Sequence, residues 1–350
     1  MNRADAIREH PEFPWLSLDD PSGLESFLHK RGWITTREHV IRCEKPGDGN
    51  MNLTMRVATE QRTLIVKQAR PWVEKYDHIS APWDRIRYEC RFYERVARIP
   101  AVVARMPRLL GADMEARVIA LEDLSGVGSL DSLYSGDVLT AADVRQLADY
   151  LGSLHDATRG TADPDFENRE MRQLNHQHIF EFPLVENNGI DLEQLERGLS
   201  AAAARLRADT AYRELVRCAG DRYLSAGSVL VHGDYFPGSW LRTAKGVFII
   251  DPEFCFYGDP ELDLGCAIAH FRLAQQPREH VRTFLQAYFE HSGKVSIQSS
   301  LLTGFAAIEV MRRLIGVAQL PLPASRVQRA QLLDRSRRAM INQSWEELWD

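Results

Sequence analysis

The sequence predicts an α+β protein, with a β-rich first part followed by a mostly helical second part. Short apolar runs near residues 53–58 and 63–68, separated by turn residues, predict paired strands in the first part. Apolar residues at helical spacing, as in 141–157, predict helices in the second part. The last early strand ends near residue 122, so we expect one domain over 1–122 and a second over 123–350.

The composition is that of a soluble globular protein, long enough for two domains. A net charge of -6 makes neither a nucleic acid nor an anionic membrane an expected partner. No apolar run approaches the roughly 20 residues of a membrane span, and the first residues lack the apolar core of a signal peptide. The five cysteines form no Cys-x-x-Cys pair, which is typical of reduced thiols, so we expect a cytoplasmic protein.

The first part of the chain contains one glycine-bearing turn of interest. Asp20 and Pro21 predict the start of a short packing helix, with an N-cap and a proline at the first helical position. The turn over 44–53 follows, and backbone amides freed by Gly47 and Gly49 can cover phosphate groups. Most stretches of this kind are plain hairpin turns, so the pattern alone is weak.

Lys67 strengthens that interpretation. Strand alternation places it on the face of Ile65, one strand pair after the glycine turn, which is the spacing of a phosphate-binding lysine. A lysine at this place needs a carboxylate partner. The predicted helix over 83–97 offers Glu89 and Glu94 on either side of its apolar stripe, and the pattern does not choose between them.

Two further strands are predicted over 107–113 and 117–121. They lead into a short linker that contains Glu122 and Leu124. A linker of this kind can present backbone groups to an adenine ring, and it can equally be an ordinary strand-to-helix connection.

The second part begins with a helix over 141–157, in which His155 is expected to be a core or capping residue. An irregular insert over 160–192 follows. Amphipathic patterns then predict helices over 192–208 and 212–224.

The most informative stretch lies between residues 229 and 253. The runs 229–231 and 247–250 are predicted as buried strands, and the segment 240–242 can pair antiparallel with the second run. In that register Ser239 emerges beside Asp251, so residues a dozen positions apart meet at one point.

Three carboxylates converge there. Asp234 follows the first strand in a His-Gly-Asp loop, while Asp251 and Glu253 follow the second. Carboxylates this close repel one another unless cations are present, and magnesium prefers such hard oxygen ligands. Asp234 is then available to accept a proton from an attacking hydroxyl. The alternative is an ordinary hairpin with exposed acids at its ends, but the second acidic cluster in register favours the layout of kinase-like phosphotransferases.

Downstream, the segment around Asp259 and Asp263 opens a predicted helix over 264–275. Either acid can brace the catalytic loop by accepting backbone amides, and capping the helix is an equal alternative. Arg312 and Arg313 interrupt a later apolar run, where paired cations usually lie on the surface.

Several segments together carry a family resemblance: Gly47–Asn52; Ile65–Ala69 with Pro71; Asp84–Glu89; Leu121–Leu124; His232–Asp234 with Gly238 and Ser239; Asp251–Gly258; and Arg312-Arg313 with Gly316. In these segments the chain resembles 5-methylthioribose kinases, a branch of the aminoglycoside phosphotransferase and choline kinase-like superfamily. The run Asp-Pro-Glu-Phe-x-Phe-Tyr-Gly is the most specific of them.

The resemblance implies a two-lobed protein kinase-like fold that uses ATP and Mg²⁺. It also implies phosphate transfer to a hydroxyl of a ribose-like sugar, with 5-methylthioribose of methionine salvage first, and suggests a homodimer. Asp234 is the implied catalytic base, and Glu89 the implied partner of Lys67. The implied nucleotide residues are Gly47, Gly49, Asn50, Asn52, Lys67, Glu89, Glu122 and Leu124; the metal residues are Asp251, Glu253 and Ser239; the substrate residues are Asp234, Tyr235, Arg312 and Arg313.

One departure from the family leaves the acceptor open. After His-Gly-Asp the chain has Tyr235-Phe-Pro237, where the resemblance leads us to expect Leu-His-Thr. A second hypothesis is therefore a kinase for another small alcohol, amino alcohol or aminoglycoside. A third is a catalytically silent nucleotide-binding module, which predicts the loss of Lys67, Asp234 or Asp251, although all three are present.

Overall fold

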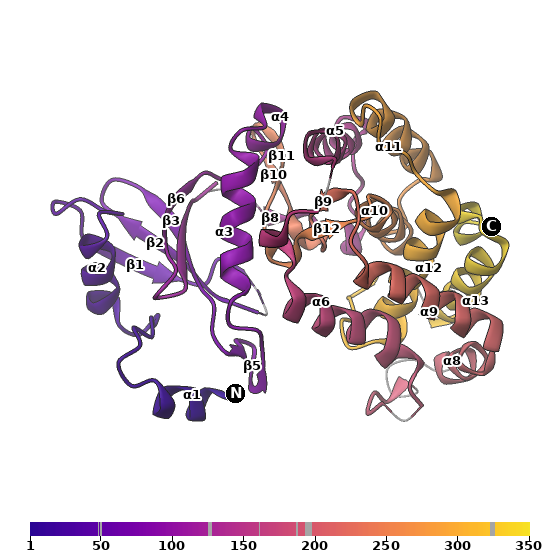
Figure 1. Cartoon of the computed structure of the whole chain (residues 1–350), viewed down its shortest axis with the longest axis horizontal. Helices are drawn as coiled ribbons and strands as arrows, with labels where there is room; N and C mark the ends of the chain where they lie inside the picture. The colour runs from indigo at the N-terminus through magenta and orange to yellow at the C-terminus, as the bar shows by residue number, and fades with distance from the viewer. Residues whose placement is uncertain are drawn as a thin grey trace. The chain divides into compact units, whose positions relative to one another are not determined.

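The computed structural model describes the whole chain except residues 48, 50, 125–127, 161, 187, 193–197 and 323–325, and the side chains of 326 and 327. It divides into two compact units, Met1–Val127 and Gly128–Asp350 (Figure 1). The first is β-rich and the second mostly helical, as expected, and the division falls slightly later than residue 122. Among the helices that the structure describes, none has both the length and the apolar composition needed to cross a bilayer.

The N-terminal unit is built on a five-stranded antiparallel sheet in the order β1-β2-β3-β7-β6. Its strands are β1 (Val40–Glu44), β2 (Leu53–Thr59), β3 (Thr63–Gln68), β6 (Leu109–Asp113) and β7 (Val118–Glu122), beside a separate ribbon of β4 (Trp72–Val73) and β5 (Tyr76–Ser80). The helices are α1 (Arg3–Glu9), α2 (Pro21–Lys30), α3 (Arg85–Val96) and α4 (Pro100–Val103).

The two faces of this sheet have different partners. Leu64 and Val66 point into an apolar core that also contains Leu28 of α2. Lys67 points to the other face, as the strand alternation predicted, and reaches Glu89 of α3. The helices α2 and α3 therefore cover opposite faces of the sheet (Figure 1).

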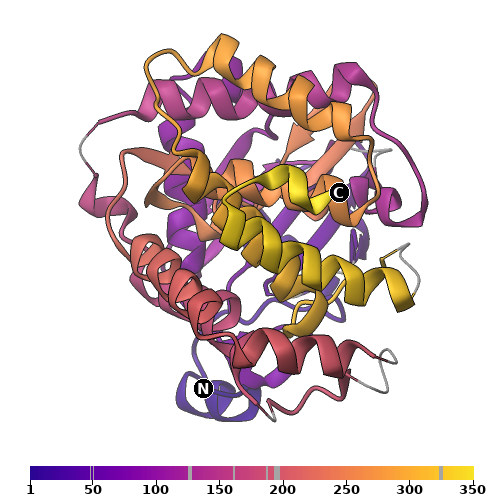
Figure 2. The same ribbon diagram turned by 90° about the vertical axis from the view of Figure 1, so that its right-hand side faces the viewer.

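The C-terminal unit contains eight labelled helices among its described residues, and it faces the viewer in Figure 2. They are α5 (Ala141–Thr158), α6 (Arg169–His176), α8 (Leu199–Ala208), α9 (Thr210–Leu224), α10 (Glu261–Leu273), α11 (Arg278–His291), α12 (Ser299–Ile315) and α13 (Arg326–Asn342). Its short strands are β8 (Gly128–Ser129), β9 (Val229–Val231), β10 (Trp240–Thr243), β11 (Gly246–Ile249) and β12 (Phe256–Gly258), which form the sheets β11-β10-β8 and β12-β9.

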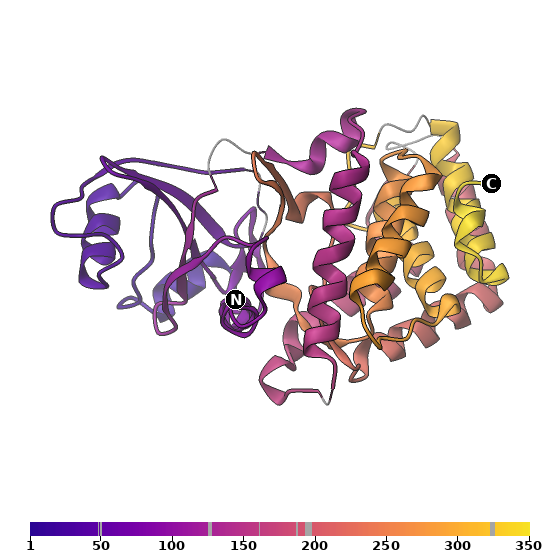
Figure 3. The same ribbon diagram turned by 90° about the horizontal axis from the view of Figure 1, so that it is seen from above.

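Two helices, α10 and α12, form the centre of this unit and are buried along most of their length. They approach closely at Gly265, which has no side chain. A Cβ added there would lie 2.9 Å from the backbone nitrogen of Ala306. The long helices α5 and α11 lie side by side next to this centre (Figures 2 and 3). The close approach brings side chains of α10 and α12 within hydrogen-bonding distance.

Most local signals in this unit correspond to the observed elements, but the insert predicted as irregular over 160–192 contains the helix α6. Thr140 and Asp143 form a capping box at the start of α5, and Arg242 pairs with Val247 in the predicted hairpin register. His155 lies in the core, where its ring contacts the Tyr288 hydroxyl at 3.0 Å. Of the helix predicted over 192–208, residue 192 is helical and 199–208 form α8, whereas residues 193–197 lie outside the described part.

Candidate active site

The His-Gly-Asp loop follows β9 and is braced from α10. The two carboxylate oxygens of Asp263 accept the backbone N–H groups of His232 at 2.7 Å and Gly233 at 2.9 Å. Asp259, the alternative brace, forms an ion pair with an arginine of α9 instead. A fully buried carboxylate therefore holds the backbone that carries Asp234.

The loop lies directly against the acidic turn that follows β11. Gly233 has a φ of +84°, and a Cβ at this position would lie 2.3 Å from the carbonyl oxygen of Phe254, so only glycine fits. The ring Nε2 of His232 lies 2.9 Å from the carbonyl oxygen of Ile250, and the Ile250 N–H donates to the carbonyl of Ser239 at 3.0 Å. These contacts bring the loop, the hairpin and the acidic turn together, as the register predicted.

The acidic turn offers hard oxygen donors in a constrained backbone. Asp251 adopts a left-handed φ of +64°, and the Glu253 side chain is nearly buried. Ser239 donates its hydroxyl to the carbonyl oxygen of Asp234 at 3.0 Å. Asn168, the residue before α6, donates to the carbonyl oxygen of Glu253 at 2.9 Å. This donor set of carboxylates and a hydroxyl fits a magnesium ion.

The two arginines of α12 lie beside Asp234. Surface placement is usual for paired cations, but Arg312 and Arg313 are only 7% and 6% exposed. Their Nη2 atoms lie 3.5 and 3.7 Å from Oδ1 of Asp234. Burial raises the pKa of the Asp234 carboxyl above its usual range, and the two guanidinium groups oppose that rise.

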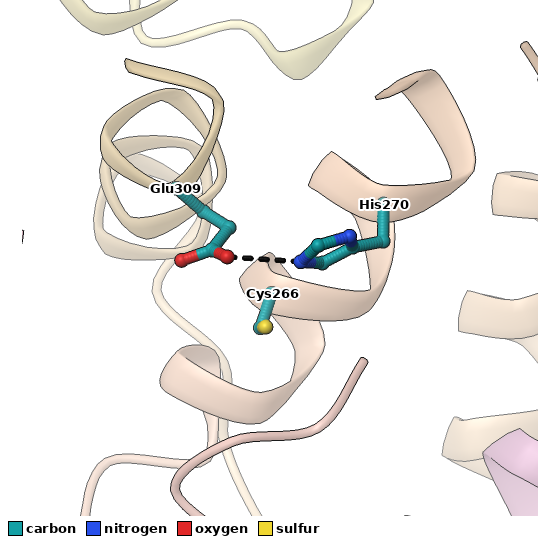
Figure 4. Close-up of side chains that lie close together, drawn as sticks. All are labelled: Cys266, His270 and Glu309. Atoms are coloured by element: carbon teal, nitrogen blue, oxygen red, sulfur yellow. Dashed lines mark hydrogen bonds and ion pairs between the residues drawn. The ribbon is translucent and has the colours of Figure 1, made fainter. Parts of the chain in front are cut away.

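Behind the arginines, Glu309 and His270 form a buried contact, with Cys266 nearby (Figure 4). Oε1 of Glu309 lies 2.9 Å from Nε2 of His270. The spacing of the three side chains would suit a metal ion, but Glu309 also accepts the Nε–H groups of Arg312 and Arg313. Two adjacent guanidinium cations already neutralise the carboxylate, so a metal cation is disfavoured in this cluster.

In the N-terminal unit, Lys67 and Glu89 form a buried ion pair. The Lys67 Nζ lies 2.7 Å from Oε1 of Glu89, and the two side chains are 7% and 0% exposed. Glu94, the alternative left open by the sequence, is exposed on α3. The structure therefore pairs Lys67 with Glu89.

The glycine turn is anchored at its end by a buried arginine. Asn52 accepts the Nε–H of Arg85 at 2.8 Å, and an Nη2–H of the same guanidinium donates to the carbonyl of Met51 at 2.7 Å. Gly47 and Gly49, the two glycines of the turn, are exposed. Asn50, also predicted to bind nucleotide, lies outside the described residues.

Comparison with known proteins gives the family. The profile of the phosphotransferase enzyme family matches residues 42–296, which include the lysine, the His-Gly-Asp loop and the acidic turn. The chain belongs to this family.

Curated relatives of this phosphotransferase include methylthioribose kinases of several bacteria. The one from Exiguobacterium sibiricum is 26% identical over 328 residues, which cover 79% of this chain and 80% of the relative. The one from Bacillus pumilus is 28% identical over 354 residues, or 85% of each chain. The crystal structure of LicA in complex with AMP aligns with a TM-score of 0.50 at 15% identity, covering 91% of this chain and 97% of that one. The family resemblance and the expected fold are thereby confirmed.

Three further predicted residues of the phosphotransferase have contacts within their own units. Tyr235 was expected to contact the acceptor, but its side chain is fully buried and its hydroxyl donates to the carbonyl of Leu147 at 2.9 Å. Its ring stacks on Tyr150, so it supports the loop from within the core. The carboxylate of Glu122 accepts Nε–H of an arginine in the N-terminal unit, and Leu124 is partly buried.

Three residues of the phosphotransferase that hydrogen-bond to the glycine turn, the acidic turn or the arginine pair were not predicted from the sequence: Arg85, Asn168 and Glu309. The contact of Glu309 could have been predicted from its spacing. It precedes the arginines by three and four residues and therefore lies on the same face of a helix. The other two join segments that are distant in the sequence, and such contacts have no local pattern.

Proposed function

We propose that this phosphotransferase is a magnesium- and ATP-dependent kinase of a small ribose-like sugar, with 5-methylthioribose as the first candidate acceptor. The observation that carries the proposal is the carboxylate of Asp234, partly exposed at 23% and facing two buried arginines. The named activity of the two relatives described above supports the choice of acceptor.

In this proposal Asp234 accepts the proton of the attacking sugar hydroxyl. Its raised pKa makes it a better proton acceptor than a solvated carboxylate. Arg312 and Arg313 bind negative charge on the phosphoryl group and keep the acceptor oxygen near Asp234. Phosphoryl transfer requires little covalent work from the protein, so positioning and charge compensation account for most of the catalysis.

Asp251, Glu253 and Ser239 are the residues that would hold Mg²⁺. A bound magnesium ion would neutralise phosphate charge and orient the phosphoryl group. In the N-terminal unit, Lys67 would bind phosphate oxygens of ATP, and Glu89 keeps its ammonium group in place. The amides of Gly47 and Gly49, the side chains of Asn50 and Asn52, and the linker at Glu122 and Leu124 complete the proposed nucleotide residues.

The test is ADP release with a panel of acceptors, measured for the wild type and for Asp234→Ala. We expect methylthioribose to be phosphorylated, and the variant to lose at least about 100-fold in kcat because its general base is gone. ATP binding should survive, as measured by calorimetry. Asp259→Asn is the control, since this acid forms an ion pair with an arginine of α9 and does not brace the loop. Unchanged turnover in Asp234→Ala would remove Asp234 from the mechanism.

A second candidate is a kinase for a cationic acceptor, such as an amino alcohol or aminoglycoside. The same panel separates it, because turnover with choline or an aminoglycoside and none with methylthioribose would refute the first proposal. The buried arginine pair favours a neutral acceptor, since two cations beside the base repel a third. A catalytically silent nucleotide-binding module predicts a thermal shift with ATP but no ADP from any acceptor.

The setting of the enzyme is also a proposal. The five cysteines are free thiols, which supports a reducing compartment and hence the cytoplasm. A homodimer is suggested by the family resemblance, and light scattering of the purified full chain would test it.

A further inference from the structure

Each arginine beside Asp234 is held by one edge and presents another. The Nε–H groups of both Arg312 and Arg313 donate to Glu309, the second at 2.8 Å. Their Nη2 atoms face Oδ1 of Asp234 at 3.5 and 3.7 Å. Because a guanidinium is planar and rigid, fixing its Nε edge also fixes the direction of its Nη groups. Glu309 therefore sets the direction in which both arginines point.

The charge of Glu309 is what allows the two arginines to be buried together. Two nearly buried guanidinium cations side by side repel each other and have lost most of their hydration. Although burial opposes it, the guanidinium groups of Arg312 and Arg313 hold the pKa of Glu309 well below its usual range. The carboxylate is therefore ionised and compensates one of the two cations, while Asp234 compensates the other.

The far side of Glu309 is braced in turn. Since a carboxylate only accepts, the Nε2 of His270 carries the proton of their 2.9 Å contact, and Nδ1 is left to accept the Tyr134 hydroxyl at 2.6 Å. Both of these partners are buried. The ring of Phe236 lies 4.6 Å from the Arg313 guanidinium carbon and 5.2 Å from the His270 ring. Glu309 thus has hydrogen-bond partners on two sides and little freedom to move.

We propose that Glu309 is a positioning residue: with His270 and Tyr134 behind it, it holds Arg312 and Arg313 in the orientation that serves Asp234. Glu309 does not contact the reacting groups itself, and its effect on catalysis is exerted through the two arginines. The kinetic consequence rests on the proposed function, because it requires an acceptor whose phosphorylation can be measured.

The first test is Glu309→Gln, which keeps the shape of the side chain and removes its charge. A neutral amide offers one oxygen, so one of the two Nε–H groups loses its acceptor. We expect kcat to fall by about 100-fold, as for a small misplacement of a catalytic group, with the KM for the acceptor raised and ATP affinity unchanged. A variant with normal kcat and a lowered melting temperature would overturn the proposal, since that is the result of a purely structural role.

The matched control is Glu261→Gln. Glu261 is another buried glutamate of the same unit, but it accepts the backbone N–H of Gln298 and lies away from the arginines. Its loss should lower the melting temperature while kcat is kept. A fall in kcat equal to that of Glu309→Gln would show that any buried charge of this unit matters, and would refute the specific role.

Coupling between residues supplies a second kinetic test. If Glu309 acts only through the arginines, then Glu309→Gln should cost much less in an Arg312→Gln background than in the wild type. An equal fold-loss in both backgrounds would mean that Glu309 acts independently of Arg312, and would contradict the proposal.

A spectroscopic test needs no acceptor. The Nε–H signals of Arg312 and Arg313 should be protected from exchange in the ¹H–¹⁵N spectrum of the wild type and of Glu261→Gln, and at least one should be lost in Glu309→Gln. If Glu309→Gln does not fold, Glu309→Asp keeps the charge but shortens the reach, and should weaken the same signals. Signals unchanged in the variant that folds would refute the positioning role. Failure of the proposed function would appear differently, as a wild type with protected signals and no acceptor.

Discussion

Lys67 and Glu89 form an ion pair whose contribution to the stability of the fold depends on its burial. An exposed pair contributes little to stability, because water solvates both charges. The side chains of this pair are only 7% and 0% exposed, so water screens the attraction between the two charges very little. The family resemblance implied Glu89, but the helical pattern alone could not choose it over Glu94, since both flank the apolar stripe of α3 and the choice depends on how the helix is rotated against the sheet.

At this scale we predict the effect of Glu89→Gln. It removes the charge that lies 2.7 Å from the Lys67 ammonium group, and breaking a buried ion pair in this way typically costs about 3 to 5 kcal/mol of stability. The KM for ATP should rise as well, because the ammonium group loses its fixed position. Chemical denaturation and steady-state kinetics measure the two effects. Glu94→Gln, on the exposed side of the same helix, is the control and should leave both quantities unchanged; an equal effect there would contradict the assignment of the partner.

At the scale of elements, the catalytic loop, the hairpin and the acidic turn show what could be predicted from the sequence. The hairpin register followed from two apolar runs and a short turn, and the observed pairing of Arg242 with Val247 confirms it. The burial of the arginine pair could not be predicted, because it depends on α12 packing closely on α10 at Gly265. Contacts between elements that are distant in the sequence determine such burial, and local sequence patterns do not predict those contacts.

Gly233 offers a test at this scale. Gly233→Ala adds a methyl group to a residue with a φ of +84°, and places it 2.3 Å from the carbonyl oxygen of Phe254. The left-handed backbone alone costs about 1 kcal/mol, and the clash must in addition move the loop away from the acidic turn. We expect a lowered melting temperature and a loss of kcat of about 100-fold, since Asp234 moves with the loop.

The control for this substitution is Gly189→Ala. Gly189 has nearly the same φ, +85°, and no atom within 4 Å of an added Cβ. It should therefore show only the backbone cost, with kcat kept. A similar loss of kcat in both variants would mean that backbone strain, and not the contact with Phe254, is responsible.

At the scale of the whole molecule, the uneven distribution of charge matters more than its sum. The net charge of -6 excludes few functions, whereas the buried cations of α12 lie next to the catalytic loop. Each of the two units has its own core, and the α+β class and the order of elements could be predicted from periodicity. The roles of Asn168 and Arg85 could not, because each joins segments that are far apart in the sequence.

Buried histidine makes the stability of the folded chain depend on pH. Burial, reinforced by Arg313 and opposed by the hydrogen bond to Glu309, lowers the pKa of His270 from 6.5 to about 4. Between these two values the unfolded chain binds a proton that the folded chain does not. The free energy of unfolding must therefore fall as the pH is lowered from about 6.5 to about 4, by up to about 3 kcal/mol from this residue at 1.36 kcal/mol per pKa unit.

His270→Gln, which cannot titrate, should lack this part of the dependence when unfolding by urea is followed at several pH values. His39→Gln is the control with the opposite sign, because Glu25 raises the pKa of this exposed histidine and its removal cannot flatten an acid-side loss. An unchanged pH dependence in His270→Gln would mean that the pKa of His270 is the same in the folded and the unfolded chain, and would contradict the lowering by burial.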